Sequence, residues 1–414
     1  MFKKIRKMSV KVTNFCNLDC VYCHQLRKDK DNTDSFRLYD ELEDFLRRCT
    51  FAERVPVTVA GGEISLRPRE FEECVRRFSS MEFATFTPNI VTNGSNIKNV
   101  LKQIRKGYIR PDAVNVSWDG IHSYSKTRHG KKNIYSDAFF NSNLRTLASL
   151  GFGRSICLMY AVTPYNVGDM YDSLVYALGE GMRNFYFYLI HEASYENKDF
   201  LKEFQKQEEL VADEFVKRYD TEDRFMLYNY QNFYTRVAGS HDFLSDITCK
   251  KLGSALHFDM EGDIYPCLYF GDHRAFQIGN LLDGGIYLDR IEEFSDKFLR
   301  RPICLEKHCG LRNCFECPAS DYISYGEMQE RRCNGCAVRA IEAEIFGKVM
   351  SRIHISDYDK HAFWHDEDSL SYDHMLYRSF EPDKLGVPLA SSEAHKKPML
   401  RIASETEKRV STWL

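Results

Sequence analysis

Long hydrophobic runs are absent from this sequence, and their absence limits where the protein can act. No stretch of the 414-residue chain approaches the roughly 18 consecutive apolar residues of a membrane-spanning helix. The basic residues Met1–Lys7 are followed by polar and cysteine-bearing sequence, where a secretory signal has an apolar core. We therefore expect a cytoplasmic protein with no membrane partner.

An excess of charge of one sign is also absent. The chain has 57 Lys and Arg residues against 60 Asp and Glu residues, a formal net charge of −3. Proteins that bind nucleic acids usually carry a basic excess, so no nucleic-acid partner is expected. Hydrophobic residues make up 43% of the chain and charged residues 28%, which is typical of a globular protein with a sizeable core.

Disulfide bonds are not expected either, because the cytoplasm keeps thiols reduced. The 14 cysteines therefore need another explanation, and metal binding is the leading one. The length of the chain predicts one large domain and a smaller one.

The first half of the chain alternates strand-like and helix-like segments, which predicts a parallel sheet. We expect an α/β fold, a partial (β/α)6 TIM-like barrel with a small cysteine-rich C-terminal domain. The expected strands are Met8–Thr13, Pro56–Ala60, Thr87–Thr92, Ala113–Ser117, Ser155–Val162 and Asn184–Ile190. The expected helices are Arg69–Phe78, Ile97–Lys106, Ala138–Leu150 and Gly168–Leu178.

Changes in composition divide the chain into four expected regions. Residues 1–191 form the barrel core, and residues 192–240 form a charged, helical connector or cap. Residues 241–345 are rich in cysteines and turns, which is typical of a small domain organised by metal. Residues 346–414 begin as a helix and end as a polar tail.

Three cysteines with C-x3-C-x2-C spacing, Cys16, Cys20 and Cys23, follow the first expected strand. Cysteine thiolates hold iron–sulfur clusters, and three of them leave one iron of a four-iron cluster open to a small molecule. The alternatives are buried thiols or a zinc site. Zinc usually takes four protein ligands, so it would need help from His24 or Cys49.

The triplet resembles the signature of the radical S-adenosylmethionine (SAM) superfamily, in which an aromatic residue commonly precedes the third cysteine, as Tyr22 does here. Further motifs resemble those of the family at successive strand ends. These are Ala60-Gly61-Gly62-Glu63, Val91-Thr92-Asn93-Gly94, Ser117-Trp118-Asp119-Gly120 with Arg128, and Val162 to Asn166. One departure is Ile64, where the family usually has proline. Each motif is weak alone, and their order along the chain makes the set specific.

The resemblance implies roles for these residues. Cys16, Cys20 and Cys23 would hold a 4Fe–4S cluster, and Gly61, Gly62 and Glu63 would contact the amino group of SAM. The TNG segment with Asn93 would also border SAM, as would Tyr22. Ser117 and Asp119 would face the ribose, and Arg128 the carboxylate side. The cluster would cleave SAM to a 5′-deoxyadenosyl radical, which would take a hydrogen atom from the substrate.

Eight further cysteines lie towards the C-terminus: Cys249, Cys267, Cys304, Cys309, Cys314, Cys317, Cys333 and Cys336. Eight thiolates can ligate two four-iron clusters or two zinc ions. Cys249, Gly262 and Cys267 resemble the opening of the SPASM extension of radical SAM enzymes, which carries auxiliary clusters. The later spacings depart from that pattern, so the eight are not divided between the two expected auxiliary clusters.

The remaining cysteines and a histidine pair have simpler interpretations. Cys49, Cys74 and Cys157 have no partner in spacing and are expected to be buried structural thiols. His361 and His365 stand four residues apart without a cysteine framework, which favours a solvated or interface helix.

The sequence motifs do not identify the substrate. Relatives with the SPASM extension mostly modify peptides or proteins, so we expect a peptide or protein substrate that is oxidatively modified or crosslinked. An electron donor such as flavodoxin or ferredoxin would be the other partner. The alternatives are a radical SAM dehydrogenase acting on a small molecule and a non-catalytic zinc or iron–sulfur scaffold.

Overall fold

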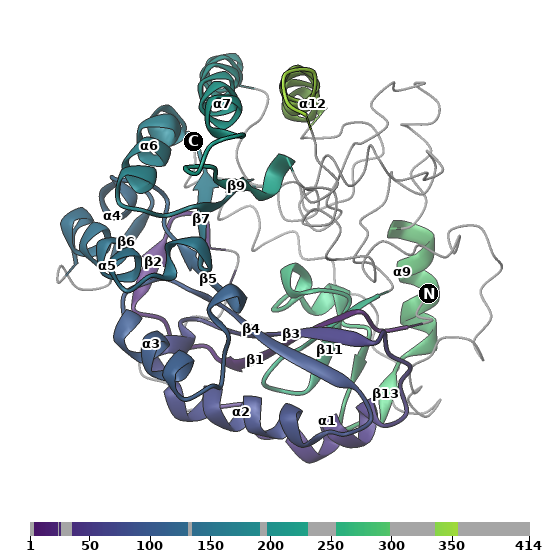
Figure 1. Cartoon of the computed structure of the whole chain (residues 1–414). Coiled ribbons are helices and arrows are strands. Elements are labelled where there is room, and N and C mark those ends of the chain that lie inside the picture. Colours follow the sequence, from purple (N-terminus) through teal and green to yellow (C-terminus); the bar gives the residue numbers. More distant parts are fainter. Residues whose placement is uncertain are drawn as a thin grey trace.

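The computed structural model describes residues 4–23, 25, 35–130, 135–190, 197–230, 254–298 and 336–354, without the side chains of 295–298 and 336. An 11-stranded, mostly parallel sheet organises this part of the chain, in the order β13-β12-β11-β10-β1-β3-β4-β5-β7-β8-β9. Figure 1 shows how the strands and helices follow one another around it. The α/β class with a partial TIM-like barrel is thus confirmed.

The six expected strands are present in the expected order. They are β1 (Lys7–Thr13), β3 (Arg54–Gly61), β4 (Thr85–Thr92), β5 (Val114–Ser117), β7 (Cys157–Val162) and β8 (Asn184–Leu189). Each pairs in parallel with its neighbour in this list. Parallel neighbours need crossover connections, and the helices that the sequence predicted between them provide these.

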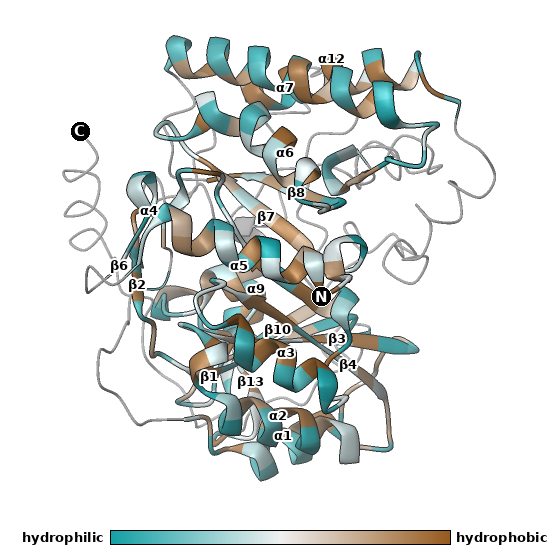
Figure 2. Cartoon of the chain, turned by 60° about the vertical axis from the view of Figure 1, so that its left-hand side comes forward, coloured by the Kyte–Doolittle hydropathy of each residue, from teal (hydrophilic) through white to brown (hydrophobic). Residues whose placement is uncertain are grey.

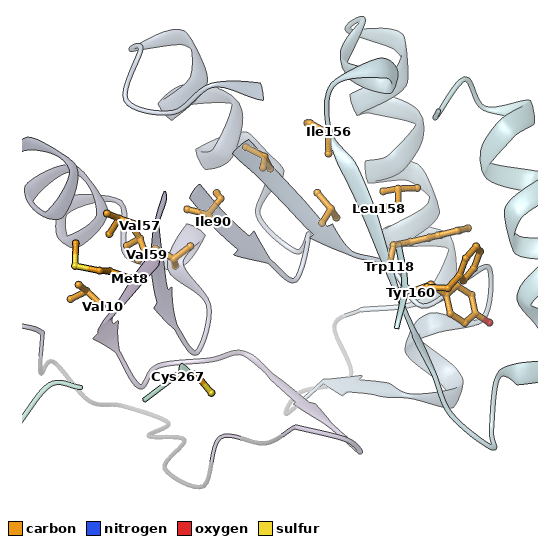
Figure 3. Close-up of a cluster of buried hydrophobic side chains, with 14 of the residues drawn as sticks. Met8, Val10, Val57, Val59, Ile90, Trp118, Ile156, Leu158, Tyr160 and Cys267 are labelled. Carbon is orange, nitrogen blue, oxygen red and sulfur yellow. The ribbon is translucent and has the colours of Figure 1, made fainter. Parts of the chain in front are cut away.

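The four expected helices are also present, as α2 (Pro68–Ser80), α3 (Ile97–Arg105), α5 (Asp137–Ser149) and α6 (Met170–Gly179). Two further helices lie in the same region, α1 (Tyr39–Leu46) and the short α4 (Ser123–Lys126). Met8, Val10, Val57 and Val59 belong to the buried hydrophobic core of the sheet (Figure 3). Alternation along each strand points the neighbouring residues to the opposite face.

The sheet continues beyond the six strands at both edges. At one edge β9 (Met226–Leu227) pairs with β8, and at the other β10 (Ala255–Phe258) pairs in parallel with β1. The antiparallel strands β11 (Asp263–Tyr265), β12 (Gly279–Asn280) and β13 (Gly285–Ile286) follow β10, and helix α9 (Leu288–Phe298) comes next. Strand pairing therefore crosses the boundary expected at residue 240, and the four-region division stays a prediction.

Two long helices pack against each other outside the sheet. Helix α7 (Lys198–Arg218) lies in the expected connector, and α12 (Cys336–Met350) runs beside it (Figure 2). Their contact brings residues around 340 onto the barrel half of the chain. In the described residues, no helix is both long enough and apolar enough to cross a membrane.

Candidate active site

The cysteine triplet lies in the loop that leaves the carboxyl end of β1. A two-stranded antiparallel pair that the sequence did not predict supports this loop: β2 (Leu18–Cys20) pairs with β6 (Arg128–Gly130). The register sets Cys20 opposite Arg128. A turn in which the Cys23 amide donates to the Cys20 carbonyl at 3.1 Å brings the last two cysteines together.

The triplet has the donor chemistry of a cluster site. Cys16 is buried, and Cys20 and Cys23 are half-buried at the mouth of the partial barrel. In the part of the chain that the structure describes, no three His, Cys, Asp or Glu side chains are gathered tightly enough to hold a metal ion as they stand. His24, the possible fourth zinc ligand, lies outside the described residues.

The glycine motif after β3 packs directly against the cysteine loop. The Gly62 amide donates to the Thr13 carbonyl at 3.0 Å, and the Glu63 amide donates to the Phe15 carbonyl at 2.7 Å. A Cβ atom on Gly62 would lie 2.3 Å from the Phe15 carbonyl oxygen, which is closer than real atoms allow. The resemblance implied that these glycines contact the amino group of SAM. In the structure, Gly62 lets the backbone approach the cysteine loop.

The Glu63 side chain ties the ends of two strands together. It is 1% exposed, and its carboxylate accepts hydrogen bonds from the Ser65 amide at 3.0 Å and the Thr92 hydroxyl at 2.6 Å. It also accepts from the Asn93 amide. These three donors fix the relative position of the β3 and β4 ends.

Asn93 in turn contacts the cysteine loop. Its side-chain amide donates to Asn17 Oδ1 at 2.8 Å and lies 4.0 Å from Cys16 Sγ. Asn93 and Ser117 also border the same small pocket, which apolar residues of α3 and α5 line further, among them Ile97 and Leu144. The TNG motif therefore positions the first cysteine, and Asn17 is a supporting residue that the sequence did not single out.

A buried network joins the cysteine loop to the third motif. Tyr22 donates its phenol to Asp119 Oδ2 at 2.6 Å. The same carboxylate accepts from the Thr127 hydroxyl at 2.8 Å and from the Ala161 amide at 3.1 Å. Arg128 Nη1 lies 3.9 Å from Asp119 Oδ1 and 3.5 Å from the Tyr22 hydroxyl. Tyr22, Asp119 and Arg128 were all predicted site residues, and the structure brings them together.

Burial controls the ionisation of this network. Desolvation raises the pKa of Asp119, and the Arg128 charge opposes the shift. Desolvation also raises the pKa of Tyr22. Burial works against the charge of Arg128, but the neighbouring Tyr22, Cys20 and Asp119 outweigh it, so the pKa of Arg128 is raised.

Arg128 retains capacity for a ligand. Its side chain is 3% exposed, and its buried Nε has no hydrogen-bond partner among the described residues. Buried polar groups are nearly always satisfied, so this donor has a place for an acceptor such as a carboxylate. Arg128 thus fits the carboxylate side of SAM, and Cys16, Cys20 and Cys23 supply the thiol donors that a cluster needs, although their side chains are not drawn together as they stand.

The face of the sheet turned away from the core presents polar groups. Ser9, Thr58 and Asn89 occupy one register row, next to His257 on β10. Ser9 shares a 2.8 Å hydrogen bond with His257 Nδ1, and Thr58 donates to Asn89 Oδ1 at 2.8 Å. We call this the inner face. The polar-apolar alternation of β1 was the sequence signal that could have identified it.

The inner face continues across the later strands. Met159 of β7 and Tyr186 of β8 are register partners, and Tyr186 stacks with Tyr188 at 5.9 Å between ring centroids. Asp119 and Tyr22 both affect the ionisation of Tyr188, which places this phenol beside the buried network. Tyr188 is therefore a site residue that the sequence analysis missed.

Most of the expected auxiliary ligands belong to parts of the chain that the structure leaves undescribed. Cys249, Cys304, Cys309, Cys314, Cys317 and Cys333 lie outside the described residues, as do His361 and His365. Cys267 is 9% exposed and precedes the 3₁₀ turn Leu268–Phe270, and Cys336 begins helix α12. The auxiliary clusters remain a prediction.

Comparison with known proteins agrees with this geometry. Residues 10–176 match the profile of the Radical SAM superfamily. A protein of Methanocella arvoryzae named Probable GTP 3′,8-cyclase is 29% identical over 119 residues, which are 29% of this chain and 36% of that protein. The like-named protein of Pyrococcus horikoshii is 21% identical over 314 residues, 72% of this chain and 96% of that protein. The match to the first relative thus spans about a third of its length.

The fold is shared with a solved structure described as histidine-tagged anSMEcpe with bound AdoMet. The TM-score is 0.68 at 15% sequence identity, and the likeness covers 87% of this chain and 98% of that one. The family implies a 4Fe–4S cluster and SAM as cofactors. Residues 10–176 therefore resemble a radical SAM domain, and the chain shares its overall fold with anSMEcpe.

Proposed function

We propose that the protein oxidatively modifies or crosslinks a ribosomally made peptide or protein substrate in the cytoplasm. Reductive cleavage of SAM and hydrogen abstraction from the substrate are the chemistry that the bound groups supply. Cys16, Cys20 and Cys23 would hold the cluster, and Arg128 and Asp119 would orient SAM. Auxiliary clusters in the C-terminal region would accept the remaining electron, and flavodoxin or ferredoxin would be the donor.

The uncharged polar groups of the inner face are the observation that supports a peptide substrate. Its central rows offer hydroxyl, amide and phenol groups, from Ser9, Thr58, Asn89 and Tyr188. Such groups suit the amide-rich, uncharged backbone of a peptide. A nucleoside triphosphate would favour several unpaired cations. Lys11 of β1 is paired with Asp272, and the remaining donor of Arg128 is the one we assign to the SAM carboxylate.

A second candidate is cyclisation of a nucleotide. It is supported by the relatives named GTP 3′,8-cyclase, which include a Nautilia profundicola protein 22% identical over 67% of this chain and 87% of its own length. Two titrations separate the candidates. The full chain, reconstituted anaerobically and reduced with dithionite, is given SAM with either GTP or a candidate precursor peptide encoded beside its gene.

The proposal predicts that the peptide increases release of 5′-deoxyadenosine and changes mass by loss of hydrogen, while GTP has no effect. Stimulation by GTP alone, with a cyclised product, would favour the second candidate. A Cys20→Ala variant is the control, because 5′-deoxyadenosine release must stop when the predicted cluster ligand is lost. Continued release from that variant would show that the cluster assignment is wrong.

A further inference from the structure

A buried ion pair links the first strand to a turn 261 residues later in the chain. Lys11 Nζ lies 2.7 Å from Asp272 Oδ1 and 2.9 Å from Oδ2. The two side chains are only 4% and 5% exposed. Neither residue belongs to the motifs of the SAM site.

The turn that carries Asp272 is held in an unusual conformation. Asp272 has a φ angle of 70°, and it is the one non-glycine residue with positive φ in the described part of the chain. Side chains other than glycine rarely adopt this left-handed region, although Asp and Asn tolerate it best. Such a conformation persists only where the surroundings enforce it.

A second contact holds the same turn against the sheet. Gly271 lies so close to His257 that an added Cβ atom would be 2.7 Å from the imidazole Nε2. His257 is bonded in turn to Ser9 at 2.8 Å. Ser9 and Lys11 are two residues apart and share one face of β1, so the turn contacts this strand at two successive inward positions.

The positions of both partners connect two cysteine-bearing segments. Lys11 stands five residues before Cys16 in the strand that leads into the triplet loop. Asp272 stands five residues after Cys267, just beyond the 3₁₀ turn Leu268–Phe270. We call residues 267–273 the Cys267 turn. The ion pair therefore sets the distance between the triplet loop and the Cys267 turn.

Energetics favour a positional role over a stabilising one. Burying two charges costs about as much as their attraction returns, and apolar residues of the same volume often serve stability equally well. A buried pair instead holds one particular arrangement, because each charge is satisfied only in that geometry. We propose that Lys11 is a positioning residue, which acts through Asp272 to dock the Cys267 turn on β1. This role goes beyond the proposed function and holds whichever substrate is used.

Hydrogen–deuterium exchange of the full chain tests the proposal. The variants are Lys11→Met, which keeps the length of the side chain, Lys11→Arg, which keeps its charge, and Asp272→Asn, which tolerates positive φ. Lys106→Met is the matched control, because it breaks an exposed ion pair with Glu72. We expect Lys11→Met and Asp272→Asn to accelerate exchange in residues 267–273 by roughly tenfold or more. Lys11→Arg restores most of the protection, and the control changes nothing.

A second readout separates positioning from general destabilisation. Alkylation of Cys267, followed by peptide mapping, is compared with alkylation of the core residue Cys74 in the same sample. The proposal requires that Lys11→Met accelerate alkylation of Cys267 and not of Cys74. Unchanged exchange in residues 267–273, equal acceleration at both cysteines, or failure of Lys11→Arg to restore protection would each overturn it. None of these outcomes depends on peptide or GTP turnover.

Discussion

The phenol of Tyr22 donates a 2.6 Å hydrogen bond to the carboxylate of Asp119, across 97 residues of sequence. Tyr22 stands between the second and third cysteines of the triplet, and Asp119 follows the end of β5. The bond therefore fixes the triplet loop to the opposite part of the barrel mouth. Tyr22, the aromatic residue of the cysteine motif, therefore has a structural role in holding this loop, in addition to any contact with SAM.

Loss of the Asp119 charge is predicted to destabilise the chain more than loss of the Tyr22 hydroxyl. Asp119→Asn leaves buried Arg128 without its carboxylate partner, which costs about 3 kcal/mol. Tyr22→Phe removes the 2.6 Å hydrogen bond to Asp119 and the long 3.5 Å bond from Arg128 but leaves both charges in place, which costs about 1 kcal/mol. Chemical denaturation of the two variants, without cofactors, measures both free energies of unfolding. Equal losses would show that the carboxylate charge is not what holds the network.

Gly62→Ala is predicted to displace the cysteine loop. The new Cβ atom would lie 2.3 Å from the Phe15 carbonyl oxygen, in backbone that cannot yield without moving the loop. The expected result is loss of most of the iron that the triplet binds after anaerobic reconstitution. Gly179→Ala is the matched control, because a Cβ atom there has no neighbour within 4 Å. Normal iron content in Gly62→Ala would contradict this interpretation of the glycine.

Regular alternation made the strands and helices of the barrel predictable. Apolar residues recur in each of the six strands and alternate with polar ones in β1 and β5, and the helices between them carry apolar residues at helical spacing. The site motifs follow the strands, and parallel strands bring their carboxyl ends to one edge. The convergence of Cys16, Asn93 and Asp119 could therefore be expected from sequence alone.

Pairing between distant segments could not be predicted in this way. Strands β2 and β6 have three residues each, which is too short to show periodicity. The pairing of β10 with β1 joins segments about 250 residues apart, and no local pattern encodes it. The internal bonds of Glu63 were missed for a similar reason, since the motif identifies the residue but not its partners.

The thiols of Cys74 and Cys157 are predicted to be unreactive in the folded protein. Burial raises the pKa of each to about 12. The thiolate is the reactive form, so at pH 8 only about one thiol in ten thousand would be ionised. Iodoacetamide labelling followed by peptide mapping should leave both unmodified in native protein and modify both in guanidinium. Rapid labelling under native conditions would contradict their assignment as structural thiols.

The contact between α7 and α12 is predicted to make stability depend on pH. Glu208 of α7 is 4% exposed, and desolvation together with the charge of Glu342 raises the pKa of Glu208 to about 8. Arg339 pairs with Glu342 on the same side of α12, and Tyr230 lies close to both glutamates.

The direction of this dependence follows from proton binding. Because the folded pKa of Glu208 exceeds its unfolded value, the folded state binds more protons between about pH 4.5 and 8. The free energy of unfolding should therefore fall as the pH rises through this window, by at most about 1.4 kcal/mol per pH unit from this residue.

Glu208→Gln cannot ionise, so its denaturation midpoint should fall less steeply than that of the wild type between pH 6 and 8. Glu209→Gln is the neighbouring control, since Glu209 also faces α12, through a 3.6 Å ion pair with Lys348, but its side chain is 46% exposed. Parallel pH profiles of wild type and Glu208→Gln would show that Glu208 is already ionised below pH 6 and that the α7–α12 contact accommodates its charge.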